Sequence, residues 1–225
     1  HIERNRIFGN GSSKCDGGIT IGAGNPETLV VNNLIYGNGR NGIAFTGSKG
    51  GLHYVVNNTI HANGRNGVSA TSGQQVLLIN NVITLNGSEK GKGAGRFGVT
   101  RSGSSKTAPT GLRLLNNLIC GNRLGEINGP ALDATDSGNL TPKGTEGAGV
   151  SASPGCETPS IVYGNVNGPD GLANTADDEF TLASSSPAID KGMDPRTLGL
   201  SVLLNSIFED DFSTEAIRPS DGNAD

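Results

Sequence analysis

The sequence predicts an all-β protein built as a parallel β-helix, a single-stranded solenoid in which short strands stack coil upon coil. One segment pattern recurs five times along the first 128 residues. The composition also lacks material for a conventional core: of 225 residues, 36 are Gly, 33% are hydrophobic, 4% are aromatic and none is Trp. Stacked coils need little more than small and β-branched residues inside, because each coil buries its apolar side chains on the next.

The repeat is marked by an Asn, an Ile two residues later and a second Asn five residues later. Successive repeats start 28, 25, 23 and 36 residues apart, a spacing typical of solenoids. Short alternating apolar runs between Asn-Gly turns indicate strands rather than helices. The first Asn column is Asn5, Asn33, Asn58, Asn81 and Asn117; the second is Asn10, Asn38, Asn63, Asn86 and Asn122. The apolar columns are Ile7, Ile35, Ile60, Ile83 and Ile119, and, after a Gly, Ile19, Ile43, Val68 and Val99.

Both Asn columns have a structural explanation. An inward Asn can satisfy backbone groups that a bend leaves without a strand partner. When the next coil, ~4.8 Å above, repeats that Asn, the amides can bond to one another along the stack. We therefore expect two buried Asn ladders, and no catalytic role for these residues.

A resemblance to known proteins is most specific near the end of the chain, where Ser186 to Gly192 reads "SPAIDKG". Residues 168–192 resemble the closing segment of secreted bacterial β-helix proteins with a choice-of-anchor Q C-terminal region. The repeats resemble the right-handed parallel β-helix of the pectate-lyase-like superfamily. The resemblance implies a right-handed helix and a secreted or cell-surface location. Because the chain opens inside a repeat at His1 and stops at Asp225, we expect a piece of a longer protein.

Three regions are predicted along the chain: coils with Asn ladders at 1–128, degenerate turns and long loops at 129–165, and a C-terminal capping segment at 166–225. In the last region we expect Phe180, Leu182 and Ile189 to cover the terminal coil, whose edges and apolar column would otherwise be open. Three Cys allow at most one bridge, and Cys120–Cys156 is the predicted pair if the chain meets an oxidising compartment, leaving Cys15 free.

The charge balance excludes several classes of partner. Seventeen Lys and Arg against 21 Asp and Glu give a net charge of −4, which offers no basic footprint for nucleic acid. No run approaches the ~20 apolar residues of a membrane span. We therefore expect neither nucleic acid nor a bilayer-spanning segment, and make no prediction of oligomeric state.

Ligand candidates come from arginines at equivalent positions. Arg40 and Arg65 both follow Asn-Gly and should stand one above the other, with Lys14 near the same flank. The long excursion of the fourth repeat adds Arg96 and Arg101. Stacked guanidinium groups repel unless an anion lies between them. They can therefore contact an acidic polysaccharide, or they can simply be solvated at exposed turns; both alternatives stay open.

An acidic loop, "GPDGLANTADDEF", is the candidate metal site. Oxygens of Asp170, Asn174, Asp177 and Asp178 can converge on Ca²⁺, the hard cation such ligands suit. The same residues can instead form a plain Asx-turn loop.

Catalytic residues are not assigned. A uronate lyase needs a carboxylate neutraliser and a Lys or Arg base, and a glycoside hydrolase needs paired carboxylates. The repeats show neither cluster. The sequence therefore predicts a structural or adhesive module that contacts a polysaccharide or cell-envelope component. The alternative is a polysaccharide lyase or glycoside hydrolase of the pectate-lyase-like type.

Overall fold

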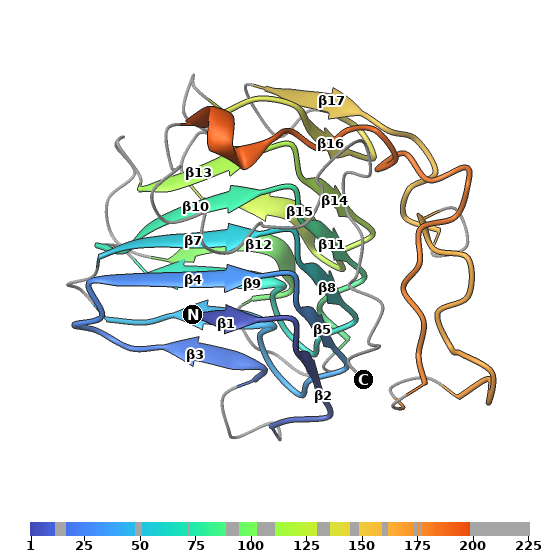
Figure 1. Ribbon diagram of the computed structural model, residues 1–225, viewed down its shortest axis with the longest axis horizontal. Coiled ribbons are helices and arrows are strands. Elements are labelled where there is room, and N and C mark those ends of the chain that lie inside the picture. The colour runs from blue at the N-terminus through green and yellow to red at the C-terminus, as the bar shows by residue number, and fades with distance from the viewer. Residues whose placement is uncertain are drawn as a thin grey trace.

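The chain winds into a solenoid with three parallel sheets, which we name A, B and C (Figure 1). The computed structural model describes residues 1–11, 17–47, 51–71, 73–88, 95–102, 111–129, 136–144, 149–158, 162–172, 175 and 177–198. Each coil passes through sheets A, B and C in that order, and the fifth coil ends at β15. The predicted all-β parallel solenoid is confirmed.

The strands are short, as the repeat predicts. Sheet A contains β1 (Ile2–Glu3), β4 (Glu27–Val31), β7 (Leu52–Val56), β10 (Gln75–Ile79) and β13 (Leu112–Leu115). Sheet B contains β2 (Arg6–Phe8), β5 (Leu34–Tyr36), β8 (Thr59–His61), β11 (Val82–Thr84), β14 (Leu118–Cys120), β16 (Asn139–Thr141) and β17 (Val150–Ala152). Sheet C contains β3 (Ile19–Ile21), β6 (Ile43–Phe45), β9 (Val68–Thr71), β12 (Phe97–Ser102) and β15 (Gly125–Asn128). A 3₁₀ turn, η1, spans Pro195–Leu198.

Both predicted ladders are present. In each, the Nδ2 of one Asn donates to Oδ1 of the Asn one coil later, as from Asn58 to Asn81 and from Asn63 to Asn86, both at 3.0 Å. From the second coil on the ladder residues are buried, whereas Asn5 and Asn10 in the first coil are exposed.

Both ladders also have ends that the repeat did not predict. The first ladder gains a sixth member, because Asn117 donates to Oδ1 of Asn139. The second ladder ends on the carboxylate of Glu126, which accepts from Nδ2 of Asn122 at 2.5 Å.

In coils two to five, an Asn precedes the first-ladder Asn and has a separate role at the corner between sheets A and B. Asn32, Asn57, Asn80 and Asn116 all adopt a left-handed backbone, with φ of 53–55°. Asn tolerates this region better than other residues with a Cβ, because its short side chain can bond locally. The paired Asn of the sequence therefore combines a backbone bend with a ladder amide.

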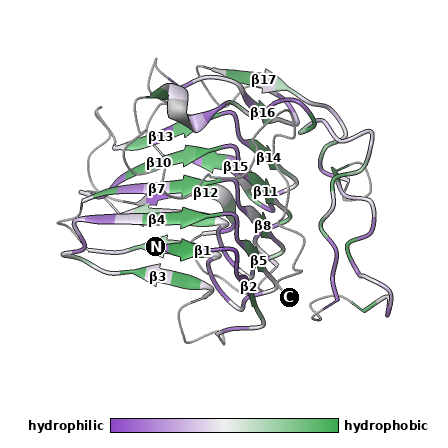
Figure 2. Ribbon diagram, in the orientation of Figure 1, coloured by the Kyte–Doolittle hydropathy of each residue, from purple (hydrophilic) through white to green (hydrophobic). Residues whose placement is uncertain are grey.

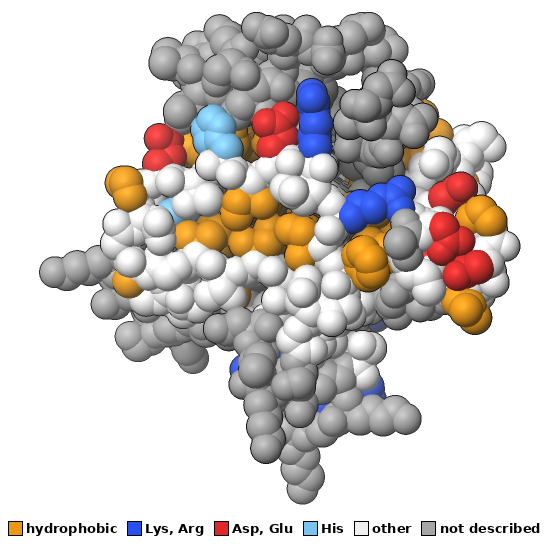
Figure 3. Space-filling model, turned by 60° about the horizontal axis from the view of Figure 1, so that its bottom comes forward, with side chains coloured by type: hydrophobic (Ala, Val, Ile, Leu, Met, Phe, Trp, Pro, Cys, Tyr) orange, Lys and Arg blue, Asp and Glu red, His pale blue; other side chains and the backbone are white. Residues whose placement is uncertain are grey.

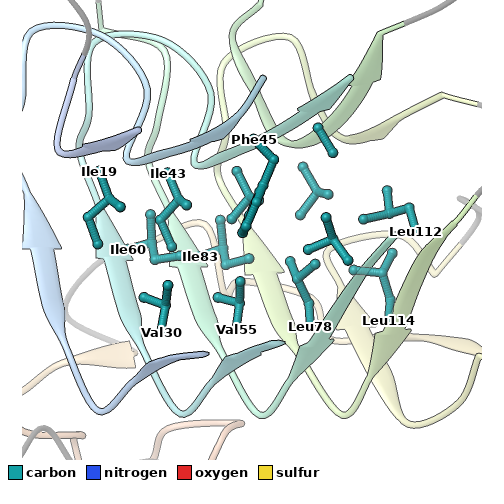
Figure 4. Packing of buried hydrophobic residues seen from close by; sticks show 14 of the residues in the cluster. Ile19, Val30, Ile43, Phe45, Val55, Ile60, Leu78, Ile83, Leu112 and Leu114 are labelled. Carbon is teal, nitrogen blue, oxygen red and sulfur yellow. The ribbon is translucent and has the colours of Figure 1, made fainter. Parts of the chain in front are cut away.

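The core lies between the three sheets and is almost entirely aliphatic (Figure 4). Both apolar columns predicted from the sequence face inward, through residues such as Ile60 and Ile43. A third inward column on sheet A was not predicted; it contains Val30, Val55, Leu78 and Leu114. Figure 2 shows the same distribution, with apolar strands in all three sheets joined by more polar corners.

A glycine begins sheet C in each of the first four coils because the interior has no room for a Cβ there. A Cβ on Gly67 would lie 2.5 Å from Cγ2 of Ile83 and 2.9 Å from Nδ2 of Asn86. The corresponding glycines, Gly18, Gly42 and Gly98, meet the same Ile column and the same ladder. The Gly-then-apolar motif therefore marks where the second ladder and the sheet B interior approach sheet C.

The described residues between 162 and 193 form a segment, here called the strap, that runs along the outer face of sheet B (Figure 1). It follows an outward column of that sheet, Phe8, Tyr36, His61, Thr84 and Cys120, which is in register across five strands. Just before the strap, Cys156 forms the predicted disulfide with Cys120, with Cα atoms 5.7 Å apart. Cys15 lies outside the described residues.

The strap meets the column with a different partner at each coil. The Tyr163 hydroxyl pairs with Oγ1 of Thr84 at 3.0 Å, and the Phe180 ring packs 5.0 Å from the rings of both Tyr36 and His61. The Tyr36 hydroxyl donates to the carbonyl oxygen of Thr175 at 2.6 Å.

Phe180 and Leu182 thus cover the side of the solenoid rather than its last coil, and Ile189 is 36% exposed. The outer face of sheet B is itself apolar and aromatic, and these two side chains join its buried cluster. At residue 193 the strap reaches the corner between sheets A and B, where both amide atoms of Asn80 pair with the backbone of Met193.

Within the described residues, the end formed by the first coil is only partly covered. Ile2 and Ile7 are only partly buried against the core, and Figure 3 shows a band of hydrophobic side chains on this face. Among the described elements, none is a helix with the length and apolarity to cross a bilayer.

Candidate functional site: an arginine ridge between sheets B and C

Three of the predicted arginines occupy one register position on consecutive coils. Pairing of Ile43 with Val68 and of Val68 with Val99 places Arg40, Arg65 and Arg96 in line, each three residues before its sheet C strand residue. The backbone N–H of Arg65 donates to the carbonyl oxygen of Arg40 at 2.9 Å. We call these three residues the arginine ridge.

The residue after each ridge arginine fixes the backbone there. Asn66 donates from its backbone N–H and from Nδ2 to Oδ1 of Asn41, at 3.2 and 3.1 Å. The backbone N–H of Phe97 donates to Oδ1 of Asn66 at 3.0 Å. This third, shorter Asn ladder was not predicted, although Asn41 and Asn66 stand at matching places in the sequence. It holds the ridge positions at the spacing of the coils.

The ridge is cationic and partly exposed. Nε of Arg40 is buried without a hydrogen-bond partner, so part of that guanidinium has lost water without gaining an acceptor. Arg123 of the next coil adds a fourth cation: a Cβ built on Gly87 would lie 2.7 Å from Cβ of Arg96 and 3.0 Å from Cβ of Arg123. Arg123 is one residue out of line, because Leu124 donates its backbone N–H to the carbonyl oxygen of Arg96.

The other two predicted ligand residues do not join the ridge. Lys14 lies outside the described residues. Arg101 is in register with Ala70 and Phe45, both of which face the core, so it faces inward at the far end of sheet C. Burial lowers the pKa of Arg101, and its Nη1 is buried without a hydrogen-bond partner. The two arginines were predicted together because they lie in one loop of the sequence. The strand register places Arg96 on the ridge and turns Arg101 toward the core.

The acidic loop is held by its own hydrogen bonds. The Thr175 hydroxyl lies 2.7 Å from Oδ1 of Asp177 and 3.1 Å from Oδ1 of Asp178. Oδ2 of Asp177 accepts from the backbone N–H of Asp170, and Oδ1 of Asp170 accepts from that of Leu172. These bonds, with that from Thr175 first, lower the pKa of Asp177. Asn174 lies outside the described residues. The described residues show Asx-turn bonds, and calcium binding by Asp170, Asn174, Asp177 and Asp178 stays a prediction.

The two histidines in the solenoid lie on opposite sides of the coil wall. His53 faces the core, stacks on Phe45 and pairs through Nε2 with Oε1 of Gln74 at 2.9 Å. His61 faces the strap and pairs through Nδ1 with Oγ1 of Thr84 at 2.9 Å. Burial lowers the pKa of His61 to about 4. Within the described ranges no three His, Cys, Asp or Glu side chains come together as a metal site would require.

Comparison with known families assigns the solenoid. Residues 1–126 match the model of a family described as periplasmic copper-binding protein (NosD). The chain belongs to the NosD family. The matched residues cover this NosD chain from β1 to the start of β15, including all of the arginine ridge and Arg123, and end before β16, β17 and the strap. No curated protein and no solved structure matched the chain. The pectate-lyase-like and choice-of-anchor Q resemblances therefore stay predictions.

Proposed function

We propose that this chain is an extracytoplasmic β-helix module that contacts an anionic polysaccharide through its arginine ridge. The observation that carries the proposal is the register of Arg40, Arg65 and Arg96 on three consecutive coils. The family description, periplasmic, supports the compartment, and the Cys120–Cys156 disulfide suits an oxidising one.

The ridge places three like charges on consecutive coils, and a bound anion would be attracted to all of them. Neighbouring guanidinium groups at the coil spacing of ~4.8 Å repel by about 1 kcal/mol in water. Each guanidinium presents a planar fork that matches a carboxylate, and such charge-assisted bonds are stronger than neutral ones. An acidic polymer lying along the ridge would add attractive contacts that offset this repulsion.

Copper is the ligand named in the family description, so its fit to this chain can be examined. Copper prefers imidazole and soft sulfur ligands. His53 and His61 lie on opposite faces of the coil wall, Cys120 and Cys156 are joined to each other, and Met193 packs on the outer face of sheet A. These described residues do not converge, so they do not fit a copper site and no step is assigned to copper.

Calcium at the acidic loop is not part of the proposal, because its described carboxylates already accept bonds from Thr175 and the backbone. The lyase alternative stays a prediction. The ridge could neutralise a substrate carboxylate, but a lyase also requires a base at the adjacent carbon.

The test is binding to an acidic and a neutral polysaccharide, polygalacturonate and dextran, by isothermal titration calorimetry. The Arg40→Ala, Arg65→Ala double variant should bind polygalacturonate at least tenfold more weakly than the wild type. A matched control, Arg4→Ala with Lys191→Ala, removes the same charge at two exposed sites near the corner between sheets A and B, away from the ridge. Wild-type binding should weaken as salt rises, because exposed charges are screened. Equal losses in the ridge and control variants would overturn the proposal.

A further inference from the structure

We infer that the ligand of the arginine ridge is a linear polyanion lying along the solenoid axis, with one anionic group for each coil. This inference rests on the proposed function and adds the orientation and repeat of the polymer.

The arrangement of charge at the corner between sheets B and C fixes the direction. In the second coil Arg40 follows Gly37, Asn38 and Gly39, and in the third coil Arg65 follows Ala62, Asn63 and Gly64. Each of these corners therefore offers one cation and otherwise only small, neutral residues. A polymer crossing the corner sideways would meet a single arginine, whereas one running along the axis meets an arginine at every coil.

The spacing along the axis is set by backbone geometry. Coils in register lie ~4.8 Å apart, and the Asn41–Asn66–Phe97 bonds hold the ridge to that spacing. A rigid array loses little conformational entropy when a matching ligand binds. The ridge therefore favours polymers that carry a carboxylate on every unit.

Within the described residues, the straight array contains three arginines. In the next coil the register position holds Leu124, and Arg123 stands one residue aside. A fourth anionic unit would thus lose the alignment that the first three share. Because the units are linked, each aligned contact after the first forms at high effective concentration. Affinity should rise steeply up to three units and then level off.

The experiment measures binding of galacturonate and its linear oligomers of two to six units to the 225-residue chain. For the wild type we expect affinity to rise at least fivefold per added unit up to three units, and less than twofold per unit beyond three. Arg65→Ala removes the middle arginine and should abolish most of this length dependence. Arg123→Ala, the matched control, should leave the rise up to three units unchanged.

Two results would count against these ideas in different ways. If no uronate of any length binds, the proposed function itself fails. If the trimer and hexamer bind the wild type no more tightly than the monomer does, or if Arg123→Ala flattens the dependence as much as Arg65→Ala, then the axial alignment is wrong while acidic-polysaccharide contact stands.

Discussion

Asn58 and Asn81 are joined through their side chains, with Nδ2 of Asn58 donating to Oδ1 of Asn81 over 3.0 Å. Asn58 Nδ2 also donates to the carbonyl oxygens of Val30 and Val56, and its Oδ1 accepts from both the backbone N–H and Nδ2 of Asn33. One buried amide therefore satisfies groups from three coils.

Replacing Asn58 by Ala should lower the free energy of unfolding by about 1–3 kcal/mol, because several buried polar groups lose their partner together. A denaturant titration measures this change. Asn5→Ala removes an exposed member of the same ladder and should cost much less. Equal stabilities of Asn58→Ala and wild type would contradict the ladder.

Gly67→Ala should destabilise by about 2 kcal/mol, since its Cβ would lie 2.5 Å from Cγ2 of Ile83 and 2.6 Å from the carbonyl oxygen of Gly98. Gly22→Ala is the matched control, because a Cβ there meets nothing within 4 Å. Thermal unfolding of both variants distinguishes steric exclusion from a general cost of replacing Gly. If Gly67→Ala melts at the wild-type temperature, the core can rearrange to accept the added Cβ.

The strap should loosen in acid because it buries His61 in neutral form. Desolvation lowers the pKa of His61 from 6.5 to about 4 in the folded protein. The unfolded state therefore takes up a proton first as pH falls below 6.5, and the stability that neutral His61 contributes is lost between pH 6.5 and about 4. The loss is about 3 kcal/mol.

The measurement is the free energy of unfolding of wild type and His61→Phe at pH 7 and pH 4. Other groups that act near His61 or its neighbour Tyr36 are Tyr163, Asp177, Asp178 and Arg6, and both proteins retain them. The wild type should lose about 3 kcal/mol more than His61→Phe over this range. Parallel losses in the two proteins would show that His61 does not control the strap.

The acidic loop should keep its structure without calcium, because the hydroxyl of Thr175 already bridges Asp177 and Asp178. We expect the same melting temperature in excess chelator and in millimolar calcium. Thr175→Val should raise the pKa of Asp177 toward its ordinary value, as an NMR titration would show. A melting temperature that rises with calcium in the wild type, but not in Asp177→Ala, would instead establish the metal site.

The ladders could be predicted from sequence because their chemistry leaves little choice of residue. A side chain of this length that both donates and accepts along the axis must be Asn, so the same residue recurs at every coil. The sequence did not predict the inward column of sheet A. Its residues, Val30, Val55, Leu78 and Leu114, differ in type and have no flanking Gly or Asn that would mark a repeat. Apolar packing accepts several residues at one place.

The outward column of sheet B could not be predicted from the sequence pattern. Phe8, Tyr36, His61, Thr84 and Cys120 are of four different chemical kinds, and the sequence indicated only an outward or bend position for them. Each faces its own surroundings, from the Cys156 sulfur to the Phe180 ring, across 36 or more residues of chain. These contacts depend on where the strap packs against sheet B, and no local sequence pattern indicates that. The ridge was predictable at Arg40 and Arg65 for the same reason as the ladders, since their coils repeat closely.

The ladders also give the solenoid an electrical polarity. In the bonds between buried ladder residues, each Nδ2 donates to the Oδ1 of the later coil, so these bonds point the same way and polarise one another along the stack. The positive end of the second column lies at Asn122, and there a carboxylate, Glu126, receives the last bond. Replacing Glu126 by Gln would keep a hydrogen-bond acceptor at the end of the column and remove the negative charge. The two proteins would then differ only in how strongly that acceptor stabilises the aligned amide dipoles. In this respect the stack behaves as an α-helix does, with an axial field produced by side chains instead of peptide groups.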